Sequence, residues 1–423
     1  MFYIRINFIY LVNMNLNNRE IKIISFYLLG FCLILFVLKL FFFNDLLSQN
    51  QFLNWDAAHY NSIRKDGYEG FLVAFFPLFP LIWKWTHLGV FGVVVLNAFI
   101  YLISFYLLIK RMKVDVLETV LYLSVPSAIF YYLPYTESLF FMSSTMLILG
   151  VKNDKLYQVL IGLFFCTLSR PSFTVLIPSL ILLELLTYKN FTFFVKRFLS
   201  YFSVCLVAIL IVAYVQYLST GKWFEFFSVQ QGWGNELQVP SFPLTSWGGN
   251  MIVRLDGVAF VFGILSGVLL LLNLLKVKLV SKLRLPNEVL LSLSYLGGIT
   301  LIVLLFRGGS LFSLNRFVFA APFILIVVNY YLNKDFYFSK KQIFILFISL
   351  ILYWLFFGSY VHIQAFLKYT LVSIYLLLFF LIKLENRKWN QFYIISFISI
   401  NFFFQVYFFI HFLMSKGSEG WVG

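Results

Sequence analysis

Apolar runs of membrane-spanning length recur along the chain from residue 24 to residue 413, separated by short polar breaks. A helix needs about 20 apolar residues to cross a bilayer, and in lipid its backbone polar groups must be hydrogen-bonded within the segment. The pattern therefore predicts an all-α, polytopic membrane protein of about 13 transmembrane helices. The predicted spans are 24–43, 88–109, 116–133, 136–150, 156–169, 172–188, 198–218, 257–275, 287–306, 317–333, 342–358, 366–383 and 391–413.

The apolar stretch 71–86 departs from this pattern because it contains Pro77 and Pro80. Proline removes a backbone donor and breaks a helix unless neighbouring groups or water satisfy the freed carbonyls. Counting this stretch as a span would also place the basic cluster at 110–113 on the outer side. We predict a re-entrant or interfacial element there.

The basic residues indicate an orientation. Most of the 32 Lys and Arg residues lie on the cytoplasmic side if the N-terminus is inside, as the positive-inside rule requires. The polar first 23 residues lack a small-residue cleavage site and are expected to be a cytoplasmic start. With the C-terminus outside, a single domain covering 1–423 has two long extracytoplasmic loops, 44–87 and 219–256.

Composition excludes a water-soluble enzyme. The chain is 61% hydrophobic and 12% charged, against roughly 45–50% and roughly 25% in soluble domains. The net charge of +15 comes from short clusters between apolar runs, which is typical of topology signals, so nucleic acid is not expected as a partner. The three cysteines lie within apolar runs and no pair of the four histidines has metal-ligand spacing. No metal site or cofactor is predicted, although assistance by a divalent cation stays open.

The first long loop reads NWDAAHYNSIRKDGYEG at 54–70. Asn54 is predicted to cap a helix whose first turn holds Asp56, with His59 and Tyr60 on the same face. With Trp55, such a helix would lie in the headgroup plane, where Asp56 could act as a general base on a lipid-borne substrate. The alternative is that Asp56 only offsets the helix dipole, an effect of roughly 0.3–1 kcal/mol.

Three further charged residues lie at predicted outer helix ends. Glu137 follows Thr136 in PYTESLFF, and a helix start with Thr136 as its cap explains both residues. Arg170 in LSRPS and Arg316 in SLNRF could extend to the interface, or they could bind phosphate through their planar guanidinium groups.

The second long loop combines Trp223, Trp233 and Trp247 with Gln230 and several glycines. This mixture suits sugar recognition through ring stacking and amide hydrogen bonds. An interfacial aromatic belt would concentrate tryptophan equally well.

The motifs along the chain resemble one enzyme family. WDAAHYNSIRKDGY at 55–68, followed by AFFPLFPLI at 74–82, resembles the signature of the PIG-V-type mannosyltransferases, integral membrane enzymes whose eukaryotic members add the second mannose to GPI anchor precursors. The resemblance covers roughly residues 50–325. The arginine turn reads Arg-Pro-Ser where eukaryotic members have Arg-Ser-Asn-Gly, so donor and acceptor details are not carried across. The order continues with PYTESLFF at 134–141, SRPSF at 169–173, VQQGWG at 229–234 and RFVFAAPF at 316–323.

The resemblance implies a glycosyltransferase C-type fold, a catalytic acid in the first extracytoplasmic loop and a polyprenyl-phosphate-linked sugar as donor. Asp56 would be the general base of an inverting transfer to a hydroxyl of a glycolipid, glycan or protein acceptor. Arg316 and Arg170 would stabilise the leaving phosphate, and Glu137 would orient the acceptor or serve as a second acid. The expected substrate contacts are Trp55, His59, Tyr60, Arg170, Gln230, Trp233 and Arg316.

Two other functions remain open from sequence. A lipid-linked oligosaccharide flippase or other transporter should carry charged residues near mid-span, whereas Lys39 and Glu184 lie toward predicted span ends. A non-enzymatic scaffold would leave Asp56 replaceable. The residue bias and the lack of large soluble insertions favour a bacterial plasma (inner) membrane location with an extracytoplasmic site, or the ER membrane in a eukaryote.

Overall fold

The computed structural model describes residues 19–187, 190–246, 250–275, 285–357, 363–385 and 389–414. Over these ranges the chain is helical, with isolated β-bridges and no strand, so the all-α prediction is confirmed. By length and apolar composition, six of the described helices could cross a membrane. They are α2 (Arg19–Phe41), α5 (Val90–Met112), α10 (Phe191–Thr220), α12 (Asn250–Leu274), α14 (Asn287–Phe306) and α19 (Asn390–Met414).

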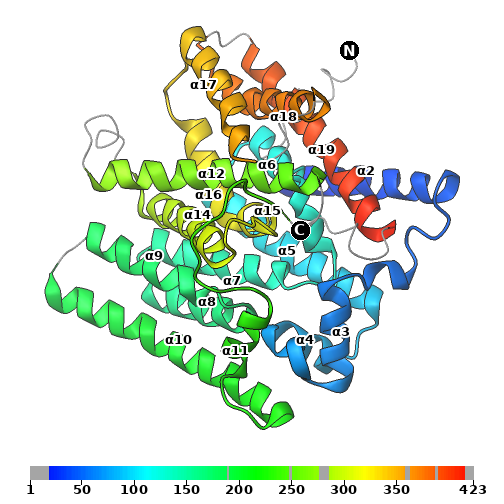
Figure 1. The fold of residues 1–423 in the computed structure, drawn as a ribbon, viewed down its shortest axis with the longest axis vertical. Coiled ribbons are helices and arrows are strands. Elements are labelled where there is room, and N and C mark those ends of the chain that lie inside the picture. The colour runs from blue at the N-terminus through cyan, green and yellow to red at the C-terminus, as the bar shows by residue number, and fades with distance from the viewer. Residues whose placement is uncertain are drawn as a thin grey trace.

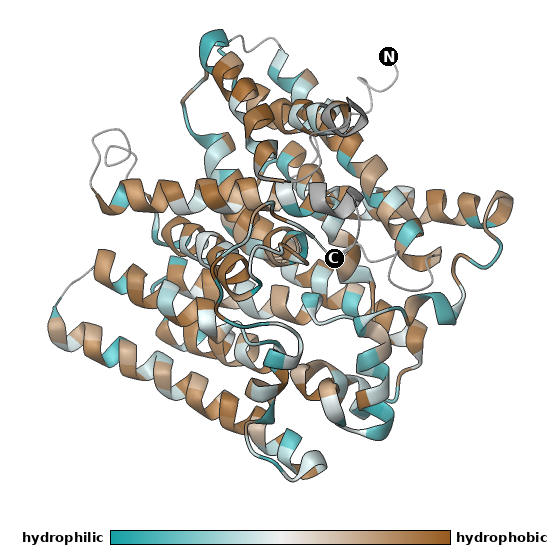
Figure 2. Cartoon of the chain, viewed as in Figure 1, coloured by the Kyte–Doolittle hydropathy of each residue, from teal (hydrophilic) through white to brown (hydrophobic). Residues whose placement is uncertain are grey.

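Shorter helices occupy several of the other predicted spans, and the total of about 13 spans stays a prediction. These helices are α7 (Glu137–Lys152), α8 (Leu156–Ser169), α9 (Phe173–Leu186), α17 (Lys340–Tyr353, followed by η5, Trp354–Phe356) and α18 (Ile363–Leu381). Hydrophobic residues dominate the helices, and hydrophilic residues gather in the connections and around the short helix α3 (Asp56–Asp66; Figure 2).

Two predicted spans are broken, so the prediction of continuous helices over 116–133 and 317–333 was wrong. The first consists of α6 (Val116–Leu123) and the 3-10 element η4 (Pro126–Tyr132), and the second of α15 (Leu314–Phe319) and α16 (Pro322–Asn333). Pro126 and Pro322 each begin the later element, because the residue before a proline is disfavoured in the α-helical region. Both breaks adjoin the charged cluster described below.

Helix α12 crosses the middle of the molecule and packs against α14 (Figure 1). Small residues allow this close approach, since a Cβ added at Gly297 would lie 2.9 Å from the Cα atom of Gly267. Helices α17 and α18 lie at one end of the view, and α10 lies toward the other, where it packs on α8 and α9 (Figure 1).

The segment 44–87 contains no helix of spanning length. It forms η2 (Gln49–Phe52), α3 (Asp56–Asp66), η3 (Gly70–Ala74) and α4 (Leu78–Thr86). The nine residues of α4 rise about 14 Å, less than half of a hydrocarbon core of about 30 Å. Pro77 is the N-cap of α4, and Pro80 lies in its first turn, where proline is tolerated. In the second long loop, α11 (Glu225–Gly232) packs on η3, while Trp247 lies outside the described residues.

Candidate active site

Four charged residues from four separate segments converge on one cluster. The Nη1 atom of Arg316 donates to Oδ2 of Asp56 at 2.6 Å, and its Nε atom donates to Oε1 of Glu137. The Nη2 atom of Arg170 lies 2.9 Å from the same Glu137 oxygen. The structure therefore brings together the two carboxylates and two arginines that the sequence singled out.

The four side chains differ in their access to solvent. The side chain of Glu137 is 0% exposed and that of Arg316 is 7% exposed, whereas Asp56 keeps 23% of its side-chain surface. A buried carboxylate is tolerated when it is paired, and Glu137 has two guanidinium partners. Asp56 is thus the carboxylate of this cluster that a substrate can reach.

Aromatic rings enclose the two arginines. The Cζ atom of Arg316 lies 4.8 Å from the ring centroid of Tyr135 and 5.3 Å from that of Phe130. Arg170 lies 4.6 Å from the ring of Phe140. These rings exclude water, which strengthens the electrostatic interactions inside the cluster.

The start of α3 differs from the prediction. Helix α3 begins at Asp56 after Trp55, which adopts a φ of 56° that is uncommon for a non-glycine residue. The prediction of Asn54 as a helix cap was wrong: its side chain donates to the carbonyls of Gln51 and of Phe412 in α19. The second of these hydrogen bonds ties the first long loop to the C-terminal helix α19.

Helix α7 begins at Glu137 as expected, but Thr136 does not cap it with its side chain. The Thr136 hydroxyl oxygen instead accepts a hydrogen bond of 2.8 Å from Nη2 of Arg170. The predicted capping role of Thr136 was wrong because the arginine turn takes up this oxygen.

The short helix α15, which carries Arg316, is held by a buried polar network that the sequence did not reveal. The Oδ1 atom of Asp256 accepts from the backbone N of Asn315 at 2.9 Å and from its Nδ2 atom at 2.7 Å. The Oδ1 atom of Asn315 accepts from the hydroxyl of Ser127 in η4 at 3.0 Å. Ser313, at the N-cap of α15, has a φ of 64°. A strained residue therefore precedes the charged group in α15 as in α3, and such strain is common at functional sites.

The other predicted contact residues belong to α3, to its N-terminal end and to the second long loop. His59 packs edge-on against Phe71 and contacts Phe75, and Tyr60 is buried against Phe75. Burial lowers the pKa of His59, although Asp56 acts in the opposite direction. Trp233 is 46% exposed and packs on the Phe71 and Phe75 rings, so the second long loop covers part of the first. Gln230 lies in the same loop segment, where its Oε1 atom accepts from Asn235 at 2.6 Å.

Arg307 is a site residue that sequence reasoning missed. Its Nε atom donates to Oδ1 of Asn235 at 3.1 Å, and its Cζ atom lies 6.0 Å from the ring of Phe317. Burial lowers the pKa of Arg307 to about 10. The charges of Asp256 and Asp56 act to raise this pKa and the charge of Arg316 acts to lower it, so Arg307 interacts with the same group of charges. The available signal was an arginine at the end of a predicted span followed by two glycines.

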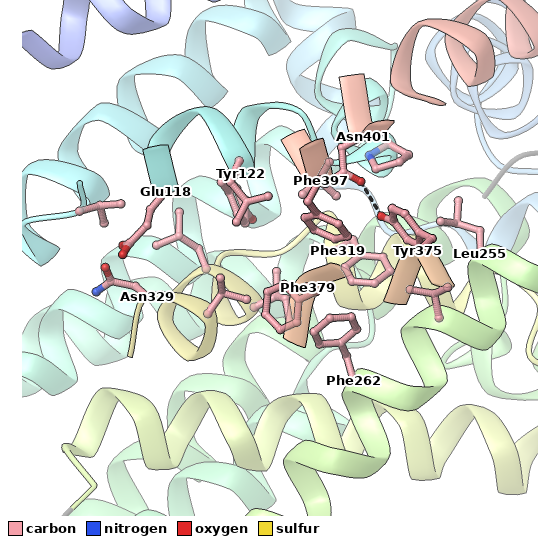
Figure 3. Close-up of a pocket in the computed structure, with 18 residues that line it drawn as sticks. Glu118, Tyr122, Leu255, Phe262, Phe319, Asn329, Tyr375, Phe379, Phe397 and Asn401 are labelled. Carbon is pink, nitrogen blue, oxygen red and sulfur yellow. Dashed lines mark hydrogen bonds between the residues drawn. The ribbon is translucent and has the colours of Figure 1, made fainter. Parts of the chain in front are cut away.

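An apolar pocket lies beside the cluster and does not include its four charged residues. Leu255, Phe262, Phe319 and Phe379 contribute to its wall, and a Tyr375–Asn401 hydrogen bond lies at one side (Figure 3). The pocket shares α15 with the cluster through Phe319. Because it offers few polar groups, we place the candidate active site at the cluster.

Within the described ranges, no group of three or more His, Cys, Asp or Glu residues is arranged to hold a metal ion. The chain matches no family model, no curated protein and no solved structure.

Proposed function

We propose that this protein is a membrane glycosyltransferase of the mannosyltransferase type, with a glycosyltransferase C-type fold of about 13 spans. It would transfer a sugar from a polyprenyl phosphate to a hydroxyl of a glycolipid, glycan or protein on the extracytoplasmic side. The observation that carries the proposal is the convergence of Asp56, Glu137, Arg170 and Arg316, with Asp56 the accessible carboxylate.

Asp56 is proposed as the general base. Its carboxylate takes the proton of the acceptor hydroxyl while that oxygen attacks the anomeric carbon of the sugar. The bond between the anomeric carbon and the phosphate oxygen breaks, and the phosphate leaves with the electron pair. The sugar passes through an oxocarbenium-like transition state and its configuration inverts.

Glu137 is proposed as a positioning residue. Its enclosed carboxylate bridges Arg316 and Arg170, so it holds the arginine that pairs with Asp56. An acceptor cannot approach a side chain that is 0% exposed without rearrangement of its neighbours. This proposed role replaces the two expected from the sequence, which were to orient the acceptor hydroxyls or to serve as a second acid.

Sugar transfer by the purified protein in lipid tests the proposal. Wild type receives radiolabelled polyprenyl-phosphate-mannose and a membrane extract, and it is compared with Asp56→Asn. The matched control is Asp66→Asn, the same change at the exposed other end of α3. General base catalysis contributes about 10²–10⁴-fold to a reaction rate, so the rate of sugar transfer should fall by that factor in Asp56→Asn. The rate should be unchanged in Asp66→Asn.

Equal transfer by wild type and a folded Asp56→Asn variant would remove Asp56 from the mechanism. No transfer by wild type with any polyprenyl-phosphate sugar would favour the transporter, which a flipping assay with labelled lipid-linked oligosaccharide in proteoliposomes would then test.

A further inference from the structure

The three arginines of the candidate site differ in their carboxylate partners. Among the described residues, Arg316 is paired with Asp56 and Glu137, and Arg170 shares Glu137. The structure shows no carboxylate within ion-pair distance of Arg307 in the described part of the chain. Arg307 is therefore the guanidinium group of this site that has no carboxylate at ion-pair distance within the described residues, and the charge of Asp256 acts on it only from farther away.

Arg307 and Arg170 both lie against the ring of Phe317. Their Cζ atoms lie 6.0 Å and 5.9 Å from the centroid of the same Phe317 ring, so they are no further apart than about 12 Å, the sum of the two distances. The Nη1 atom of Arg170 is buried and makes no hydrogen bond, so a phosphate would reach this donor only after its neighbours move. A buried donor without a partner is costly, so an acceptor that reaches it would bind favourably.

The guanidinium of Arg307 is held in place on one edge. Its Nη1 atom donates to the carbonyl of Phe312, and its Nε atom donates to Asn235, whose own side chain donates to Gln230. Its Nη2 atom makes no hydrogen bond with a described residue, and the residue is only partly buried. A rigid guanidinium with a free edge is a suitable group for binding a phosphate.

The backbone around Arg307 is also fixed. The backbone N of Ser241 donates to the carbonyl of Gly308 at 3.0 Å, and that of Thr245 donates to Gly309 at 3.1 Å. Gly309 has a φ of 96°, and a Cβ there would lie 2.5 Å from the carbonyl oxygen of Ser241. The glycines thus allow the second long loop to lie directly on the turn that carries Arg307.

We propose that Arg307 binds the phosphate of a polyprenyl phosphate, that the buried Nη1 donor of Arg170 becomes a second contact once its neighbours move, and that Asn235 holds Arg307 in its binding position. Arg316, which the sequence put forward for this role, instead holds the two carboxylates. This inference rests on the proposed function for the identity of the lipid, but phosphate binding is measurable without sugar transfer.

Binding of undecaprenyl phosphate to the purified full chain in phosphatidylcholine nanodiscs tests the inference. Undecaprenol, which lacks the phosphate, and inorganic phosphate, which lacks the chain, are measured in parallel to separate the two parts of the ligand. Wild type should bind undecaprenyl phosphate at least tenfold more tightly than undecaprenol, because hydrogen bonds to charged groups are involved.

Arg307→Gln should weaken binding of undecaprenyl phosphate about 10- to 100-fold and leave binding of undecaprenol unchanged. Lys84→Gln is the matched control, since it removes one positive charge from an exposed position of the first long loop. Asn235→Leu keeps the charge of Arg307 but removes its support, and should weaken binding by a smaller factor. This variant also carries the test if Arg307→Gln does not fold.

The inference is overturned if wild type binds undecaprenol and undecaprenyl phosphate equally. It is also overturned if folded Arg307→Gln binds the phosphate as wild type does, or, where that variant does not fold, if Asn235→Leu does. Phosphate-dependent binding that needs Arg307, without sugar transfer by wild type, would retain this site and reject the proposed transferase. If wild type transfers sugar but Arg307→Gln binds undecaprenyl phosphate as wild type does, the transferase is retained and the phosphate site at Arg307 is rejected.

Discussion

Replacing Glu137 by glutamine should destabilise the protein far more than replacing Asp56 by asparagine. Glu137 is 0% exposed and accepts from Arg316 and Arg170, so the amide would leave two buried guanidinium groups without their shared counter-charge. Removing one member of a buried ion pair costs about 3–5 kcal/mol. Asp56 is 23% exposed and pairs with Arg316, so solvent screens the loss of its charge and a cost of about 1 kcal/mol is expected.

The two variants can be compared by titrating the protein in mixed micelles with sodium dodecyl sulfate and following tryptophan fluorescence. The expected difference between their free energies of unfolding is about 2–4 kcal/mol. The double variant Glu137→Gln/Arg170→Gln should recover part of the loss, because it removes a charge of each sign. A coupling energy of about 0.5–3 kcal/mol is expected for residues in one such network.

Two results would refute this reasoning. Equal destabilisation by Glu137→Gln and Asp56→Asn would mean that the enclosure of Glu137 has no energetic weight. Strict additivity of Glu137→Gln and Arg170→Gln would mean that the 2.9 Å contact between these residues does not couple them.

Two further predictions concern a titrating residue and a helix crossing. Burial outweighs Asp56 and lowers the pKa of His59 below its ordinary value of about 6.5, so folding favours the neutral ring. The contribution of neutral His59 to the free energy of unfolding is then fully present above about pH 6.5 and is lost as the pH drops through the folded-state pKa. In unfolding titrations, His59→Gln should show a flatter dependence of stability on pH between pH 5 and 7.5. At the α12–α14 crossing, Gly297→Ala should destabilise by about 1–3 kcal/mol, because its Cβ would meet the Gly267 backbone at 2.9 Å. The control Gly30→Ala meets nothing within 4 Å and should gain about 0.5–1 kcal/mol, so equal melting temperatures for the two variants would contradict the packing argument.

The residues at the centre of the site were predictable because charge is expensive in an apolar chain. Asp56, Glu137, Arg170 and Arg316 stand out against the 61% hydrophobic background, and each lies next to a predicted helix end. Their mutual pairing was not predictable, since it joins segments separated by up to 260 positions.

Predictions from local sequence were wrong or incomplete where a side chain bonds to a residue far away in the sequence. Asn54 is a residue type that often caps helices, but its side-chain amide donates to the carbonyl of Phe412, which is 358 positions away in the sequence. Arg307 looked like one of many basic span ends, and its significance depends on the loop around Asn235 that folds against it. The two broken helices are a different case. Pro126 and Pro322 mark the breaks in the sequence, but the apolar runs on both sides of each proline were long enough to predict a continuous span.

The separation of Glu137 from Arg316 also has a consequence for biosynthesis. Arg316 follows Glu137 by 179 residues, so at 5–20 residues per second the ribosome takes roughly 10–35 s to deliver it. For most of this interval Arg170 is the only one of the two arginine partners of Glu137 that has been synthesised, and Arg316, the partner of Asp56, is absent. A chain that stalls before α15 therefore presents an unbalanced acidic group at the membrane, a defect that quality-control proteases could recognise before any activity has been made.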